Sequence, residues 1–137
     1  ISSIEDGKSE LNSFTLNKKA IALAQSGDLK NAIEHFNKAI ELDPNFSAAY
    51  NNKGIVLRQF GQIEDALSSF KKALELDNEI KGARTNVGLL LFEMQKYKEA
   101  AEYLKSEIDK KSQMFFLKCL FELDDLDSFY IQVDKHP

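Results

Sequence analysis

The sequence contains only one cysteine, two prolines and six glycines among its 137 residues. A single cysteine, Cys119, can form neither an internal disulfide nor a cysteine metal cluster, so we expect a reducing, cytoplasmic setting. So little glycine and proline excludes collagen-like and low-complexity chains. Long apolar runs are also missing: the longest, Val87 to Phe92, has about six residues, whereas a membrane span needs roughly 18–20.

The ends of the chain and its charge narrow the possible functions further. Residues 1–11 have no basic start and no apolar stretch, which argues against a signal peptide. Because the chain opens with Ile1 rather than Met, it can be a piece of a longer protein. The net charge is −4 and the pI about 5.2. We therefore expect no nucleic-acid partner and no membrane insertion.

An internal repeat with an offset of 34 residues dominates what is present. Residues 27–33 resemble residues 61–67, and Glu41-Leu42-Asp43 recurs as residues 75–77. A third copy follows at the same offset, with Gln95, Tyr97, Ala100 and Leu104 at matching positions. The length corresponds to about four such units.

Each unit is predicted to be a pair of helices, because apolar residues recur at steps of three and four. Gly27 and Gly61 fall between the helices, and Asp28 is a predicted N-cap. Small residues (Ala20, Gly54 and Gly88 on first helices; Ala32, Ala66 and Ala100 on second helices) predict close helix approach. The predicted helices span residues 13–26, 29–42, 45–60, 63–76, 79–94, 97–109, 112–123 and 126–135.

These residues resemble the tetratricopeptide repeat, a 34-residue helix–turn–helix unit, most strongly over residues 13–111. The resemblance implies an all-α superhelix, a solenoid of about three regular repeats plus a degenerate fourth helix pair. The third unit departs from the family pattern at Arg84 and Glu107, so its second helix is expected to pack less tightly. The RNA-reading pentatricopeptide repeat is disfavoured by the period and the acidic pI. The implied layout is one solenoid domain with an extension at 1–12, repeats at 13–46, 47–80 and 81–111, and a fourth repeat or cap at 112–137.

The residues needed for catalysis are not arranged in any recognised motif, so we expect no enzyme activity, cofactor or metal. The two histidines, His35 and His136, fall on the first and last units. His35 is expected to be a solvated surface residue, and Cys119 a buried small hydrophobe. Asp124-Asp125 is interpreted as a loop and cap rather than as a metal site.

The resemblance also implies that the first helix of each pair lines a concave groove. Asn17 and Asn51 share one repeat position, and Asn52 and Asn86 share another. An amide side chain offers a donor and an acceptor, matching a peptide group, so an asparagine ladder could hold an extended peptide. The alternative is that these asparagines bond to their own helices or to water. The predicted groove residues are Asn17, Lys18, Ile21, Asn51, Asn52, Ile55, Arg58, Asn86, Leu89 and Phe92.

Some family members grip the C-terminal carboxylate of cytosolic chaperones through lysine, arginine and asparagine side chains. The five corresponding positions here are Asn17, Ile21, Asn52, Gly82 and Asn86, of which only Asn52 matches. Because the basic partners of a carboxylate are missing, we expect that such a C-terminus is not the ligand.

The predicted function is therefore non-catalytic binding of a peptide or protein segment in the groove. The run from Met114 to Phe121 is unusually apolar for an end unit. It could be covered by the next helix, continue into further chain, or dock on a partner. If the run docks on a second copy of the chain, the alternative function is a self-associating scaffold, a homo-oligomer. The predicted contact residues are Phe115, Phe116 and Phe121. A regulatory arm of a larger protein is the remaining alternative.

Overall fold

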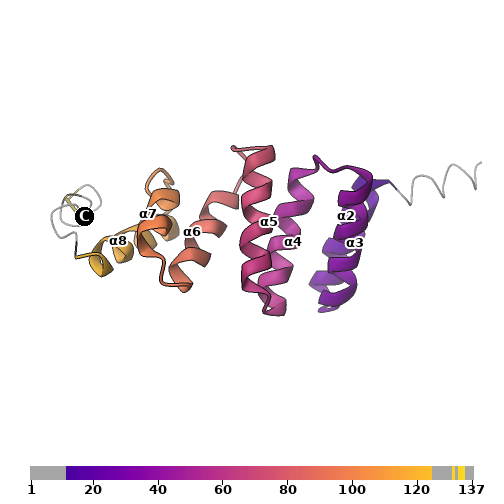
Figure 1. Ribbon diagram of the computed structural model, residues 1–137, viewed down its shortest axis with the longest axis horizontal. Helices are drawn as coiled ribbons and strands as arrows, with labels where there is room; N and C mark the ends of the chain where they lie inside the picture. Colours follow the sequence, from indigo (N-terminus) through magenta and orange to yellow (C-terminus); the bar gives the residue numbers. More distant parts are fainter. Residues whose placement is uncertain (1–11, 125–130, 132, 135–137) are drawn as a thin grey trace, which may run out of the picture. The chain divides into compact units, whose positions relative to one another are not determined.

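The computed structural model describes residues 12–124, 131 and 133–134, and in this part it contains helices and no strand (Figure 1). The predicted all-α class is confirmed. The predicted last helix, 126–135, lies largely outside the described residues, as does His136. The helices are α2 (Ser13–Gln25), α3 (Leu29–Leu42), α4 (Ser47–Phe60), α5 (Ile63–Leu76), α6 (Ala83–Glu93), α7 (Tyr97–Leu104) and α8 (Lys110–Glu122).

The chain divides into two compact units, one ending at Ile80 and one starting at Lys81. In the first unit α2 packs on α3, α3 on α4, and α4 on α5, while α4 also touches α2. In the second unit α6 and α8 both pack against α7, and α6 also touches α8. Figure 1 shows consecutive helices of the first unit running side by side, joined by short turns.

The first helix of each pair ends in the same turn. After α2, the Asp28 N–H donates to the Leu23 carbonyl and the Gly27 N–H to that of Ala24. The same two bonds recur 34 residues later after α4, with Gly61 in the left-handed region. They recur again after α6, where Gln95 takes that region at φ 63°. This double bond pattern satisfies carbonyls that a helix end leaves without partners.

Two helices begin later than their sequence pattern predicts. The helix expected from residue 45 begins at Ser47, because the Asp43 carboxylate accepts the Asn45 N–H in a turn beside the proline. The helix expected from residue 79 begins at Ala83. There the Asp77 carboxylate accepts the Glu79 N–H, and Gly82 is left-handed at φ 84°. Polar side chains that bond their own backbone thus compete with the helix start.

The third helix pair differs most from its prediction. Its second helix, α7, ends at Leu104 instead of residue 109. Asp109 is extended and caps the next helix by accepting the Ser112 N–H at 2.9 Å, so the chain must leave the helix before it. The two residues that depart from the family pattern pair with each other, with 3.4 Å between Arg84 Nε and Glu107 Oε1.

The core forms where small residues of one helix meet large residues of the next. Ala20, Ala32, Phe36 and Val56 make one buried cluster, and a second contains Leu16, Ala39 and Ala49. A Cβ added at Gly54 would lie 2.6 Å from the Phe70 ring. One added at Gly88 would lie 2.5 Å from Leu104. The predicted steric role of the small residues is therefore confirmed.

Candidate functional site

A cleft of about 220 Å³ lies between α2 and α4 in the first unit, and we refer to it as the α2–α4 cleft. Its walls come from the first helix of each of two successive repeats, with Phe36 of α3 also contributing. Three of the predicted groove residues, Ile21, Asn52 and Ile55, meet here. The full lining is Ile21, Ala24, Gln25, Phe36, Asn52, Ile55, Val56 and Gln59.

Two of the predicted asparagines bond to each other. The Asn52 side-chain amide donates to the Asn17 side-chain oxygen at 3.3 Å, which links α4 to α2. This bond joins two helices, so it differs from the alternative in which the asparagines bond to their own helices or to water. Asn17 is only 7% exposed and Asn51 9%, so both present little surface to a ligand. Asn52 is less covered, and its own oxygen and second amide hydrogen are not used by the pair.

Positive charge lies at the edge of this region. The Lys18 ammonium sits 4.8 Å from the centre of the Phe14 ring, which is 59% exposed. A cation over an aromatic face gains about 0.5–1 kcal/mol at an exposed site. This contact joins residues four apart on one helix, so the spacing could have indicated it. Arg58 is also exposed on α4.

The predicted groove residues of the second unit are more covered. Leu89 is 5% exposed, while Asn86 and Phe92 are half-buried. The Phe92 ring meets Tyr97 edge-on at 5.3 Å and Phe115 at 5.0 Å. Phe92 also lines a cleft of about 410 Å³ with Met114, Leu117, Lys118, Phe121 and Glu122 of α8. The aromatic contacts join three helices, and sequence reasoning did not identify them.

The apolar run of α8 is divided between core and surface. Cys119 and Leu120 are buried, and Phe115 and Phe116 are half-buried. Phe121 is 58% and Met114 47% exposed. Of the three residues predicted for self-association, Phe121 therefore offers the most surface.

The candidate catalytic and metal-binding residues do not converge. In the described residues, no three histidine, cysteine or acidic side chains form a group that could hold a metal. His35 is half-buried rather than fully solvated, and its Nδ1 lies 2.8 Å from the Asn31 carbonyl. Cys119 is buried as expected, and burial raises the pKa of its thiol to about 11. None of the described helices combines the length and apolarity that crossing a bilayer requires.

Solved structures with the same fold cover most of the chain. YrrB, described as a tetratricopeptide protein with an unusual peptide-binding site, is 26% identical, with a TM-score of 0.83 over 96% of this chain and 69% of its own. MamA is 19% identical, with a TM-score of 0.80 over 91% of this chain and 78% of its own. The first such domain of Spaghetti (RPAP3), bound to the HSP90 peptide SRMEEVD, is 19% identical, with a TM-score of 0.75 over 82% and 95%.

Family models agree with the structural likeness. Two tetratricopeptide repeat models match the chain, one over residues 11–79 and the other over residues 51–114. No curated protein sequence matches the chain significantly. The 34-residue period, the paired helices and the family models lead to one conclusion: this chain belongs to the tetratricopeptide repeat family.

Proposed function

We propose that the chain binds an extended peptide segment along the α2–α4 cleft, as a non-catalytic protein-interaction module. The observation that carries the proposal is the position of Asn52, a half-buried amide with spare hydrogen-bonding groups beside an apolar cleft. The description of YrrB as a peptide-binding protein of this family supports the same class of ligand.

The Asn17–Asn52 hydrogen bond gives the site a fixed orientation. Because Asn17 accepts one amide hydrogen of Asn52, the Asn52 side chain is held in one rotamer before a ligand arrives. Its remaining N–H and its oxygen match the C=O and N–H of a peptide unit. A peptide held through its backbone needs little sequence preference at that residue.

The apolar walls beside Asn52 would give the selectivity that the amide does not. Ile21 and Ile55 face the same cleft from α2 and α4, and Ile55 is 40% exposed. A volume of about 220 Å³ suits one aliphatic side chain. The proposed ligand is an extended segment whose backbone meets Asn52 and whose aliphatic side chain enters the cleft.

In the experiment, displayed random heptapeptides are selected for binding to the 137-residue chain. The affinity of a selected peptide is then measured by calorimetry. Asn52→Ala should weaken binding about tenfold, because it removes a bidentate hydrogen bond at a partly desolvated site. Ile21→Ser should weaken it by a similar factor. Asn45→Ala, an exposed asparagine in the turn before α4, is the matched control and should leave the affinity unchanged.

Equal affinities for the parent and Asn52→Ala would remove the Asn52 amide from the proposed site. Retained binding by Ile21→Ser would separately remove the apolar contact. Circular dichroism of each variant checks that the helices persist.

Self-association through α8 is the second candidate function. It is favoured by the exposed Phe121 and Met114 beside the cleft that Phe92 and Leu117 line. Exposed apolar patches on soluble proteins mark interaction sites. Light scattering at micromolar concentration should show a dimer that Phe121→Asp converts to a monomer. A parent chain that is monomeric at this concentration would rule this candidate out.

A further inference from the structure

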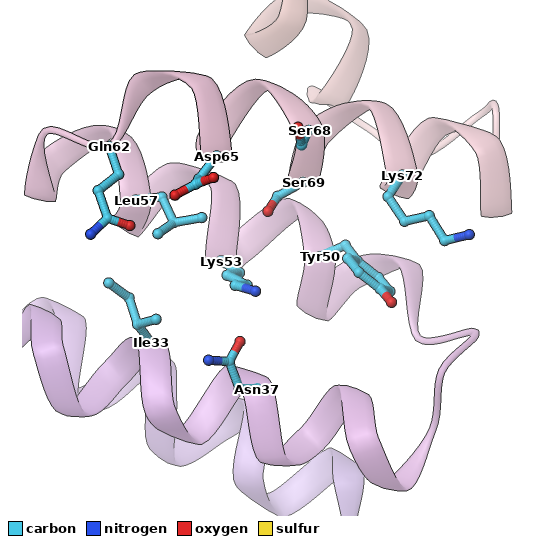
Figure 2. A pocket seen from close by; sticks show the side chains of 10 residues that line it. All are labelled: Ile33, Asn37, Tyr50, Lys53, Leu57, Gln62, Asp65, Ser68, Ser69 and Lys72. Carbon is cyan, nitrogen blue, oxygen red and sulfur yellow. The ribbon is translucent and has the colours of Figure 1, made fainter.

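A second cleft, of about 450 Å³, lies between α3, α4 and α5 of the first unit (Figure 2). We call it the lysine cleft, because Lys53 of α4 stands near its centre. Figure 2 shows the Asn37 amide of α3 pointing toward Lys53, and the Ser69 hydroxyl of α5 entering from the other side. Its lining is Ile33, Asn37, Tyr50, Lys53, Leu57, Gln62, Asp65, Ser68, Ser69 and Lys72.

The lysine cleft is on a different face of α4 from the α2–α4 cleft. Successive residues of a helix are rotated by about 100°, so Lys53 points well away from its neighbour Asn52. Tyr50 and Leu57 share the Lys53 face, whereas Asn52, Ile55 and Gln59 line the other cleft. A ligand in the lysine cleft would therefore not compete with the proposed peptide.

The third repeat carries different residues at the positions of two polar groups of this cleft. At the repeat positions of Lys53 and Ser69, the third repeat carries Val87, which is fully buried, and the large ring of Tyr103. Replacing tyrosine by serine removes most of the side-chain volume, and replacing valine by lysine brings a charge into the space. The same positions in the first repeat, Lys19 and His35, line a cleft of about 460 Å³.

Two polar groups in the cleft lack partners among the described residues. No described polar side-chain atom is both fully buried and without a hydrogen-bond partner, so the Ser69 hydroxyl, in a residue that is only 7% exposed, opens into the cleft. The Lys53 ammonium forms no hydrogen bond or ion pair with any described residue. Burial lowers the pKa of Lys53, and the Asp65 carboxylate partly offsets this effect. Both groups are hydrogen-bond donors, so the site is prepared for an acceptor that carries negative charge.

We propose that the lysine cleft is a binding site for a singly charged carboxylate, which accepts hydrogen bonds from the Lys53 ammonium and the Ser69 hydroxyl. Ile33 and Leu57 then cover the short aliphatic arm that carries the carboxylate. In this arrangement both donors of the cleft, Lys53 and Ser69, gain a charged acceptor.

The charges that line the cleft favour a ligand with one negative charge over a ligand with two. Asp65 lines the same cleft and would repel a phosphate dianion more than a carboxylate. The other lysine, Lys72, is already shared with Glu75, whose carboxylate lies 3.5 Å from its ammonium. Lys53, which has no such ion pair but feels the charge of Asp65, is therefore the ammonium left for the ligand.

The test titrates the ¹⁵N-labelled chain with four probes and follows amide shifts by NMR. The blocked tripeptide acetyl-Leu-Glu-Leu-amide and its glutamine counterpart differ only in the carboxylate. Butyrate supplies the carboxylate without a peptide, and inorganic phosphate supplies the competing anion. We expect saturable shifts at Lys53, Ser69 and Asn37 with the glutamate peptide and with butyrate, and not with the glutamine peptide. The tighter of the two carboxylates identifies a protein side chain or a free acid as the source.

Three variants separate the site from general charge effects. Lys53→Gln should weaken carboxylate binding about tenfold, as expected for loss of a charge-assisted hydrogen bond. Lys71→Gln, an exposed lysine of α5 outside the cleft, changes the net charge equally and should have no effect. Ser69→Tyr restores the residue of the third repeat and should close the cleft. If Ser69→Tyr fails to fold, Lys53→Gln still decides.

Four results would overturn the proposal. They are the absence of saturation at millimolar carboxylate, equal losses for Lys53→Gln and Lys71→Gln, tighter binding of phosphate than of carboxylate, and shifts centred on residues away from the lysine cleft.

Discussion

Single residues of this chain act mainly through the space they occupy. The fully buried alanines and the glycines of α4 and α6 allow helices to touch, whereas Ser69 and Lys53 leave a cleft where a large apolar pair could have packed.

Gly54→Ala should destabilise the chain by about 1–3 kcal/mol through overpacking. The added Cβ would meet the Phe70 ring at 2.6 Å, and that ring is 1% exposed and has no room to move. Urea unfolding followed by circular dichroism gives the change in free energy of unfolding. Lys71→Ala on exposed α5 surface is the control and should stay within about 0.5 kcal/mol. An unchanged midpoint for Gly54→Ala would show that the ring yields.

Cys119 should react slowly with a thiol reagent at pH 8 in the folded chain. Burial raises its pKa from 9.0 to about 11, so the thiolate is about a hundredfold rarer than in the unfolded chain. Reaction with Ellman's reagent, with and without denaturing urea, measures the ratio. Comparable rates in both conditions would contradict the burial of this side chain.

The same pKa difference gives stability a pH dependence of known sign. Because the folded pKa is raised, the contribution of Cys119 is fully present below pH 9 and is lost as the pH rises toward 11. The melting temperature of Cys119→Ala should therefore fall less steeply than that of the parent above pH 9. Parallel curves over this range would exclude the thiol as the source.

At the scale of helices, the turn between the two helices of each pair keeps its hydrogen bonds in all three pairs, although its left-handed residue changes. Gly27 and Gly61 take the left-handed conformation without steric cost, but Gln95 adopts φ 63° at the same repeat position. The third helix pair therefore carries backbone strain that the first two lack. Its shortened α7 and its Arg84–Glu107 ion pair belong to this same pair.

Gln95→Gly should stabilise the chain by about 0.5–1 kcal/mol, because glycine removes the left-handed cost while adding freedom to the unfolded chain. The change is measured from urea unfolding at equilibrium. Gln113→Gly, inside α8, should instead destabilise by a similar amount. A loss of stability in Gln95→Gly would mean that the glutamine side chain contributes more than its backbone costs.

The whole molecule carries a net charge of −4 and lacks basic residues at the positions that chaperone receptors use. The chaperone peptide SRMEEVD, bound by Spaghetti (RPAP3), should accordingly not bind this chain with micromolar affinity. Calorimetry at physiological salt measures this directly. Micromolar affinity of the parent chain would refute the prediction.

The amino-acid sequence by itself determined the 34-residue period, the paired helices, the Asp28 cap, the small residues of the core and the burial of Cys119. Each of these depends on local periodicity or on a single residue type. The tertiary structure alone decided that Asn52 bonds Asn17, that Arg84 pairs with Glu107, and that Lys53 and Ser69 face one cleft. Asn17 and Asn52, for example, are 35 residues apart and lie on different helices, so they meet only after the helices have packed. Such contacts depend on side-chain volume and rotamer on several helices at once, because close packing leaves each group only the partners that its neighbours allow.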